Sequence, residues 1–430
     1  MGAAAAADGV TPPPSPRSRG PRPHVVVVGA GFGGLNAVKS LLSGPIDITL
    51  LDRGNYHGFW PLLYQVATAG LAADDIAHPI RELFAGRANV RVRLGVVTHV
   101  DLDRRFVDLE DGARIEYDYV VLATGSVSAD FGIPGVAEHA FPLKTLADAV
   151  RLRNHILGAF ERADADEALV ASGVLTFVLA GGGPTGVEMA GALAELIGRN
   201  LAHDFTHLDV TAARIVIVEM ADHLLGGFSA SSQHSARSTL EARGVEVRLG
   251  AAIARVDADR VELTDGTAIP CGTVVWTAGV RAHDLASALG VPQTRGGRVA
   301  VNADLSVPGH PEAFVVGDLA GTQDPQLAQV AIQGGRHAAR AIRRLHAGRA
   351  THPFRYRNHG IMATIGRRAA VAELPGGLKL RGTPGWLAWL GVHLVFLIGF
   401  RNRIVVLITW AWNYISWDRA SRVIIPDLWG

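Results

Sequence analysis

The chain has 430 residues, which is long enough for two or three domains rather than one. Its 41 Lys and Arg residues nearly cancel its 40 Asp and Glu residues, so no basic field indicates nucleic acid as a partner. A single cysteine, Cys271, excludes an internal disulfide, whether a structural link or a redox-active dithiol. The mean hydropathy of +0.21 is high for a freely soluble protein and indicates a membrane surface.

The first 23 residues are rich in Ala, Pro and Ser. They contain five consecutive alanines but no apolar run of the roughly 7 to 15 residues that a signal peptide requires. We therefore interpret residues 1–23 as a disordered tail and expect the body of the protein to stay in the cytoplasm.

Residues 24–42 have the pattern of an apolar β-branched strand, a glycine turn and a helix, and residues 48–53 that of a second strand. The turn fits G-x-G-x-x-G with Gly29, Gly31 and Gly34 in register. The first glycine allows a tight turn, the second lets backbone N–H groups approach a pyrophosphate, and the third lets the helix pack close to the strand. Asp52 lies 18 residues after Gly34, near the spacing expected of an acid that binds a ribose hydroxyl.

The same pattern returns about 150 residues later, over residues 175–196 and 213–220, which is an internal repeat on the scale of a domain. Its register glycines are Gly181, Gly183 and Gly186, and Glu219 takes the position of the acid. A carboxylate there accepts from the 2′-OH of NADH and repels the 2′-phosphate of NADPH. The alternative is that Glu219 only ends a strand at the surface.

Each glycine turn is followed by a hairpin signal, EDG at 110–112 and TDG at 264–266, and then by an apolar strand that ends in glycine, at 119–125 and 273–279. Asp318 lies at the end of a later strand, where it is positioned to bond the ribityl or phosphate part of FAD. In two-site flavoproteins, which this pattern resembles, such a late Gly-Asp closes the FAD domain around the first turn, so the resemblance implies FAD at the first turn and NADH at the second. An ordinary strand-to-helix turn is the alternative for Asp318. A helix is predicted from about Pro325 to His346.

The last 80 residues differ in kind, because 354–374 alternates like a hairpin and 385–424 is dense in Trp and aliphatic residues. A spanning helix needs about 20 apolar residues. His393, Arg401 and Arg403 divide this segment into shorter runs. We therefore expect two interfacial helices on the inner leaflet, held by tryptophans that favour the interface: Trp386, Trp389, Trp410, Trp412 and Trp417. A buried core or a dimer contact is the alternative for this segment.

Several stretches together resemble the type II NADH:quinone oxidoreductases, the single-chain respiratory NADH dehydrogenases that do not pump protons. They include GAGFGG (29–34), YQVATAGL (64–71), GGGPTGVEMAG (181–191), LAQVAIQGG (327–335) and the Trp-rich basic stretch at 399–422. The resemblance covers nearly everything from His24 onward. The N-terminal tail, Gly334 and a polar insertion before Arg214 depart from the pattern.

The resemblance implies an α/β protein with two Rossmann-like domains and a C-terminal membrane-associating segment. The expected domains are 24–145 with 285–350 for FAD, 146–284 for NADH, and 351–430 for a hairpin and amphipathic anchoring helices. Non-covalent FAD would take a hydride from NADH and pass electrons to ubiquinone or menaquinone. The expected cofactor-binding residues are Gly29, Gly31, Phe32, Gly33, Gly34, Asp52, Thr124, Gly125, Asp318, Gly181, Gly183, Pro184, Thr185, Gly186, Glu219 and Gly279.

Three residues are expected at the reacting centre under this resemblance. Glu188 would lie at the flavin–nicotinamide junction, where it would steer the nicotinamide amide or help deliver protons to quinone; a helix N-terminal acid favoured by the macrodipole is the alternative. Gln329 and Gln333 share one helix face and would bind quinone or flavin carbonyls. Their alternative is two polar residues on a solvated surface. We expect a peripheral protein on the cytoplasmic side of the cell membrane, whose apolar tail would also suit a homodimer.

Four other functions compete with this interpretation. A sulfide:quinone oxidoreductase or a disulfide reductase needs a pair of redox cysteines, and Cys271 stands alone. A soluble flavoprotein reductase of a protein electron carrier would keep both dinucleotide sites but has no use for the Trp-rich tail. In a flavin-dependent redox sensor, NADH binding would change a surface instead of feeding electrons onward.

Overall fold

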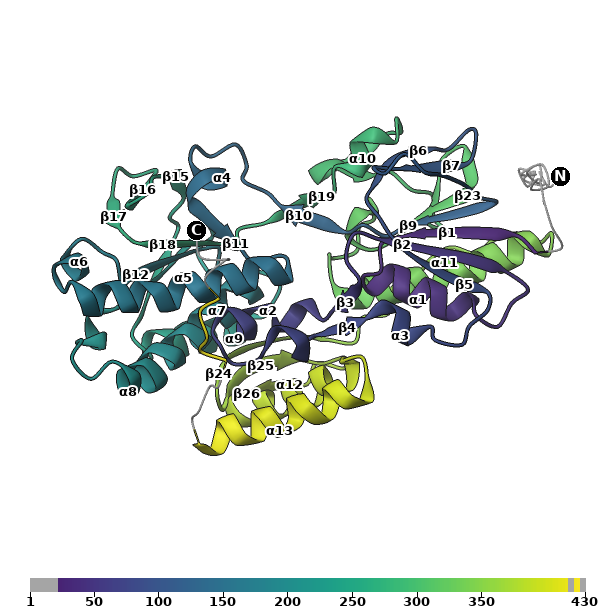
Figure 1. Ribbon diagram of the computed structural model, residues 1–430. Coiled ribbons are helices and arrows are strands. Elements are labelled where there is room, and N and C mark those ends of the chain that lie inside the picture. The colour runs from purple at the N-terminus through teal and green to yellow at the C-terminus, as the bar shows by residue number, and fades with distance from the viewer. Residues whose placement is uncertain (1–21, 417–420, 426–430) are drawn as a thin grey trace, which may run out of the picture. The chain divides into compact units, whose positions relative to one another are not determined.

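The computed structural model describes residues 22–416 and 421–425 (Figure 1). Most of the predicted tail, Trp417 and the last five residues therefore lie outside the described residues. The chain forms two compact units. Unit 1 takes in the described chain up to His57, Pro79–Val127 and Arg281–Arg357, and unit 2 takes in Gly58–His78, Ser128–Val280 and the described chain from Asn358 onward.

Unit 1 is organised by a six-stranded sheet. In spatial order its strands are β22 (Ser306–Val307), β23 (His310–Val315), β9 (Tyr119–Leu122), β1 (His24–Val28), β2 (Asp47–Asp52) and β5 (Val90–Leu94). Neighbouring strands run parallel except β22 and β23. The valines of β1 are buried, as expected of a central strand whose two faces are both covered.

Helices α1 (Phe32–Leu41) and α11 (Ala328–His346) pack against each other in unit 1. The approach is close because glycines form the contact: a Cβ on Gly335 would stand 2.0 Å from the carbonyl oxygen of Gly33. A separate antiparallel sheet holds β6 (Val97–Asp101), β7 (Phe106–Leu109) and β8 (Arg114–Glu116). Its β7–β8 turn contains Gly112 at φ +81°, which confirms the hairpin predicted at 110–112.

Unit 2 repeats the parallel architecture. Its five-stranded sheet is ordered β11 (Ala140–Pro142), β18 (Thr273–Trp276), β12 (Thr176–Ala180), β13 (Arg214–Glu219) and β14 (Val245–Leu249). Its longer helices outside the C-terminal segment are α5 (Leu146–Ala165), α7 (Pro184–Glu195) and α9 (Ala230–Glu241). A small antiparallel sheet follows, with β15 (Ile253–Val256), β16 (Arg260–Leu263) and β17 (Ala268–Pro270), and its β16–β17 pairing confirms the hairpin at 264–266.

The C-terminal segment also belongs to unit 2. It forms a three-stranded antiparallel sheet of β24 (Ile361–Gly366), β25 (Ala369–Glu373) and β26 (Lys379–Arg381), then helices α12 (Gly382–Phe396) and α13 (Phe400–Ser416) (Figure 1). Helix α12 packs on β25, and β24 packs on α7. Within the described part of the chain, no helix combines the length and apolar character needed to cross a bilayer.

Candidate functional site

The first glycine turn, between β1 and α1, has the geometry of a phosphate-binding turn. Gly29 adopts φ +101° and donates its N–H to the Leu51 carbonyl at 2.8 Å. A Cβ on Gly34 would lie 1.8 Å from the Gly29 carbonyl oxygen, so the helix start admits only glycine there. Gly31, the residue that caps α1, has no neighbouring atom within 4 Å of an added Cβ. The helix N-terminus therefore faces open space, as a site for a pyrophosphate requires.

The second turn, between β12 and α7, repeats this arrangement in unit 2. Gly181 adopts φ +104° and donates to the Val218 carbonyl at 2.9 Å. A Cβ on Gly186 would lie 2.0 Å from the Gly181 carbonyl oxygen, whereas Gly183 faces open space. Pro184 occupies the first turn of α7, where its missing N–H costs nothing, and Thr185 beside it is exposed. The internal repeat seen in the sequence is thus a repeat of geometry.

The two predicted ribose acids also hold the turns in shape, a role that the sequence reasoning missed. Asp52 accepts from the Ala30 N–H at 2.6 Å and from the Gly54 N–H at 2.8 Å. Glu219 accepts from the Gly182 N–H at 2.6 Å and from the Ala221 N–H at 2.8 Å. Burial raises the pKa of Asp52, although these backbone donors oppose the shift. In each unit the acid at the end of the second strand is bonded to the middle of the adjacent glycine turn.

The remaining predicted FAD residues gather where β9 and β23 end side by side. Asp318 accepts from the Ser126 hydroxyl at 2.6 Å. Thr124 has a buried hydroxyl with no hydrogen-bond partner among the described residues, and Gly125 follows at φ +72°. An unpaired buried hydroxyl beside an open phosphate turn fits a ligand with many hydrogen-bonding groups, and the ribityl and phosphate parts of FAD supply them. Phe32 and His57 meet edge to face beside this turn, with ring centroids 5.3 Å apart.

Glu188 lies inside unit 2, on α7. Its carboxylate is reached by the Thr364 N–H at the long distance of 3.4 Å. The Trp389 indole also lies near it, although its N–H forms no hydrogen bond of ordinary geometry with a described residue. Burial raises the pKa of Glu188 to about 8. The side chain is therefore mostly protonated at neutral pH and is able to donate a proton.

The two predicted glutamines lie one turn apart on α11 in unit 1 and contact the segment that follows this helix. Tyr356 donates its hydroxyl to the Gln329 side chain at 3.2 Å. Gln333 donates to the Arg357 carbonyl and accepts from the Arg357 N–H, both at 2.9 Å. Both amides therefore have structural partners, and their contact with quinone stays a prediction.

The tryptophans of the tail are placed differently from the expectation. Trp386, Trp389 and Trp410 are buried, and Trp412, at 61% exposed, is the tryptophan that faces outward among those the structure describes between 385 and 416. Trp389 stacks on His393 at 4.1 Å, and burial holds the pKa of His393 down at about 4. The prediction that these tryptophans form an interfacial belt was wrong for three of them, because α12 and α13 use them to pack onto the rest of unit 2.

A cavity of about 60 Å³ lies among these rings in unit 2. Trp410 donates its indole N–H to the Gln65 side chain at 2.8 Å, and Gln65 donates in turn to the Tyr64 hydroxyl at 2.8 Å. Trp386 and Trp389 complete the aromatic lining. The stretch at 64–71 that carried part of the family resemblance thus lies against the C-terminal helices.

Comparison with known proteins places these features in a family. Residues 23–335 match the family model described as pyridine nucleotide-disulphide oxidoreductase. The chain is 40% identical over 435 residues to the type II NADH:quinone oxidoreductase Ndh of Mycobacterium tuberculosis, covering 97% of this chain and 94% of that protein. The chain belongs to the type II NADH:quinone oxidoreductases. This confirms the family predicted from the sequence.

More distant matches agree with the fold of these oxidoreductases. The mitochondrial internal alternative NAD(P)H-ubiquinone oxidoreductase A1 of Arabidopsis thaliana is 29% identical, over 95% of this chain and 87% of that protein. The structure of NDH2 from Plasmodium falciparum in complex with NADH matches with a TM-score of 0.85 at 19% identity, covering 94% of this chain and 100% of that chain. These matches confirm the predicted α/β fold.

The sulfide:quinone oxidoreductase of Aquifex aeolicus shares the fold, with a TM-score of 0.71 at 20% identity over 89% of this chain and 91% of that chain. The single cysteine separates this chain from such sulfur chemistry. Cys271 is buried, and burial raises the pKa of its thiol to about 12, so the thiolate needed for sulfur transfer does not form at neutral pH.

The paired acids give a test that separates the two turns. Asp52→Ala leaves the N–H groups of Ala30 and Gly54 without their acceptor, at a cost of about 1–3 kcal/mol, and we expect the purified protein to lose bound FAD. Glu219→Ala does the same to the second turn, so we expect FAD to be retained and the KM for NADH to rise at least about tenfold. Flavin absorbance per chain and steady-state kinetics measure both. Loss of FAD in the Glu219 variant would contradict the assignment.

Proposed function

We propose that this chain is a flavoprotein that oxidises NADH and passes the electrons to a membrane quinone without pumping protons. The observation that carries the proposal is the 40% identity to a type II NADH:quinone oxidoreductase over nearly the whole chain. The two glycine turns supply what this activity needs, because FAD and NADH each require a phosphate site. The first turn would retain FAD, and the second would admit and release NADH.

Bound FAD supplies a ring that accepts a hydride from NADH and returns two electrons to quinone. The residues of this chain hold and orient the reactants. The N-termini of α1 and α7 would hold the pyrophosphates of FAD and NADH with their backbone N–H groups, and the buried Thr124 hydroxyl would bind FAD. Asp52 and Glu219 keep each turn in the shape that lets a phosphate approach.

The activity is tested by NADH oxidation with purified, membrane-bound protein and a set of short-chain ubiquinone and menaquinone analogues. We expect rapid turnover with quinone and a much poorer reaction with NADPH, because Glu219 repels its 2′-phosphate. Fast flavin reduction with slow reoxidation by every quinone would instead favour a redox sensor. Fast reoxidation by a soluble protein carrier alone would favour a carrier reductase.

We assign proton delivery to Glu188. Quinone reduction takes up two protons with two electrons, and a buried acid with a pKa of about 8 carries a proton at neutral pH without adding negative charge. The carboxyl lies on the same helix that begins at the second glycine turn, two residues after Gly186. Its position thus connects the nucleotide turn to the interior of unit 2.

Glu188→Gln removes the acidic proton and keeps the shape of the side chain. We expect flavin reoxidation by quinone in the unmodified protein to slow as pH rises through about 8, because the acid form is depleted above its pKa. In the variant this pH dependence should be absent, and the rate at neutral pH should fall roughly 10²-fold. Stopped-flow measurement of flavin reoxidation over a pH series gives both the rate and its pH dependence. Flavin reduction by NADH is the internal control. An unchanged pH profile in the variant would remove Glu188 from this role.

Gln329 and Gln333 remain the proposed quinone contacts of unit 1, and the structure provides a control for one of them. Gln329→Ala should leave flavin reduction by NADH unchanged and slow reoxidation by quinone about tenfold, the loss expected for one hydrogen bond. Tyr356→Phe removes a hydroxyl that donates to the Gln329 side chain and should change neither half-reaction. If quinone reoxidises the flavin equally slowly in both variants, Gln329 acts only by holding Tyr356 and not by binding quinone.

We further propose that unit 2 attaches to the cytoplasmic side of the cell membrane through the outer faces of α12 and α13. Exposed aliphatic and aromatic side chains gather there: Leu387, Val392, Val395, Phe396, Ile404, Leu407, Ile408 and Trp412. Apolar faces of this size on two neighbouring helices suit the boundary between headgroups and acyl chains. The same face would suit a second copy of the chain, so the test includes the oligomeric state.

Val395→Ser with Ile408→Ser removes two exposed apolar side chains, at 65% and 62% exposure, without touching the buried tryptophans. We expect affinity for neutral lipid vesicles to fall roughly thirtyfold, equivalent to about 2 kcal/mol of lost apolar burial. Leu94→Ser with Val96→Ser removes exposed apolar residues of unit 1 and should have no effect. A double variant that turns a dimer into a monomer with unchanged vesicle binding would identify the face as a dimer contact instead.

A further inference from the structure

A second cavity of unit 2, of about 500 Å³, is lined mainly by arginines. Four arginines and one glutamate form its charged lining: Arg199, Arg243, Arg367, Arg368 and Glu195. The whole chain carries a formal net charge of only +1, so this is a strong local concentration of positive charge. Neither the dinucleotide turns nor the residues assigned to quinone reduction contribute to this lining.

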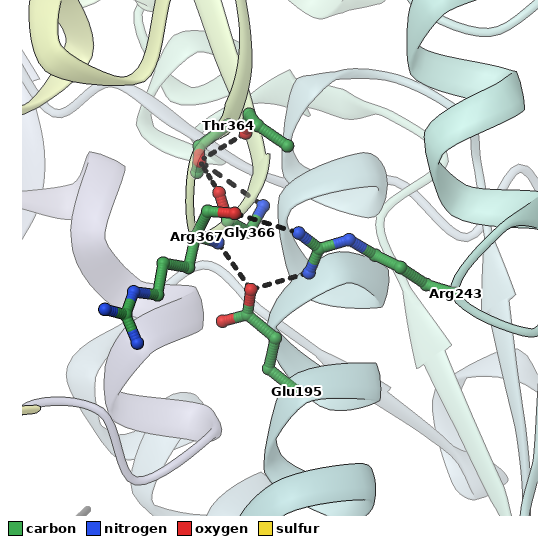
Figure 2. Close-up of polar contacts among 6 residues, drawn as sticks. Glu195, Arg243, Thr364, Gly366 and Arg367 are labelled. Atoms are coloured by element: carbon green, nitrogen blue, oxygen red, sulfur yellow. Dashed lines mark hydrogen bonds and ion pairs between the residues drawn. The ribbon is translucent and has the colours of Figure 1, made fainter. Parts of the chain in front are cut away.

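Glu195 has a structural role in the wall of this cavity. Glu195, at the end of α7, accepts from the Arg243 guanidinium at 2.6 Å and from the Arg367 N–H (Figure 2). Arg243 also donates to the Arg367 carbonyl at 3.0 Å. Glu195 and Arg243 thus neutralise each other and fix the β24–β25 turn against α7. Arg367 has two guanidinium nitrogens buried in the protein, so Arg199 and Arg368 supply the rest of the basic lining.

The backbone departs from regular geometry on both sides of the cavity. Arg199 lies in a π-helical stretch, Leu196–Leu201, and π-helical turns occur frequently at functional sites. Arg367 and Arg368 form the two-residue turn between β24 and β25, with Arg368 at φ +58°. Such turns and such φ values favour Asn or Gly, which would have avoided the strain. Strain of this kind persists chiefly where the side chain has a use.

The cavity adjoins the helices proposed to meet the membrane. It shares Glu195 and Arg367 with the aromatic cavity walled by Trp386, Trp389 and Trp410 of α12 and α13. The Thr383 hydroxyl, in the first turn of α12, donates to the Arg368 carbonyl at 3.5 Å. A cluster of guanidinium groups therefore lies beside the start of a helix whose outer face is apolar. That combination suits a molecule with an anionic head and an apolar tail.

We propose that this cavity binds the phosphate of an anionic phospholipid, an inference that rests on the proposed membrane attachment of unit 2. The planar guanidinium groups of Arg199 and Arg368 match phosphate oxygens, which guanidinium groups bind in a bidentate fashion. Basic pockets of this kind on the cytoplasmic side of membrane proteins take lipid headgroups. The bound lipid would fix the orientation of unit 2 on the membrane, which α12 and α13 alone do not specify.

The test uses the full-length protein with Arg199→Gln and Arg368→Asn together. Asn tolerates the positive φ at position 368, so the turn is preserved, and Glu195 and Arg243 remain in place. The unmodified protein should bind vesicles containing about one third phosphatidylglycerol more tightly than neutral phosphatidylcholine vesicles. In the double variant this preference should fall about 25-fold, since each arginine near an anionic surface is worth roughly a factor of five.

A matched control removes the same charge elsewhere. Arg87→Gln with Arg349→Gln alters two exposed arginines of unit 1 and should leave the preference intact. An equal loss in this control would make the effect one of net charge and would overturn the proposal. Unchanged NADH oxidation with a water-soluble quinone analogue in both variants establishes that the fold is preserved.

Two further measurements complete the test. The first distinguishes failure of the lipid site from failure of membrane attachment, and the second distinguishes a lipid phosphate from free phosphate. Binding to neutral and anionic vesicles with equal affinity would overturn the lipid site and leave membrane attachment standing, whereas binding to neither would overturn both. Inorganic phosphate provides the last comparison. Free phosphate is the ligand if inorganic phosphate raises the melting temperature of the unmodified protein but not that of the double variant, while both proteins prefer anionic vesicles to the same extent. In that case the lipid assignment is wrong.

Discussion

The hydrogen bonds between a strand-end carboxylate and the middle of a glycine turn hold both dinucleotide sites in shape. The turn must present its N–H groups outward to a phosphate, and a loop built mainly of glycine has the least tendency to keep one conformation. Asp52 bonds Ala30, and Glu219 bonds Gly182, each at 2.6 Å. The carboxylate thus fixes the turn before any ligand arrives, which reduces the ordering that binding must bring about. The same bond between a carboxylate and a glycine turn is present in unit 1 and in unit 2.

The two turns share geometry but differ in their surroundings, and that difference supports their division of labour. Beside the first turn, Thr124, Ser126 and Asp318 form a polar group in which one buried hydroxyl lacks a partner among the described residues. Such a group suits a ligand held for many turnovers. Beside the second turn, Pro184 and Thr185 are exposed, as expected where a nucleotide enters and leaves.

Sequence reasoning predicted what is encoded locally and failed where distant side chains meet. The glycine turns, the two parallel sheets and the hairpins at Gly112 and Gly266 follow from short patterns whose geometry allows few residues. The tryptophans could not be placed, because α12 is apolar on all its faces and its sequence does not mark which face is buried. The basic cavity was missed for another reason. Arg199, Arg243 and Arg367 come from three separate segments, and the overall charge balance concealed them.

Helix α12 carries both the proposed membrane face and the tryptophan that lies beside Glu188 in unit 2. Glu188 is buried beside Trp389, which is 1% exposed, and this burial raises the pKa of the Glu188 carboxyl group. The opposite face of the same helix carries Val395 and Leu387, which are exposed. The two faces of α12 thus have separate places in these proposals: the tryptophan face packs beside Glu188, and the exposed face is the one proposed to meet lipid.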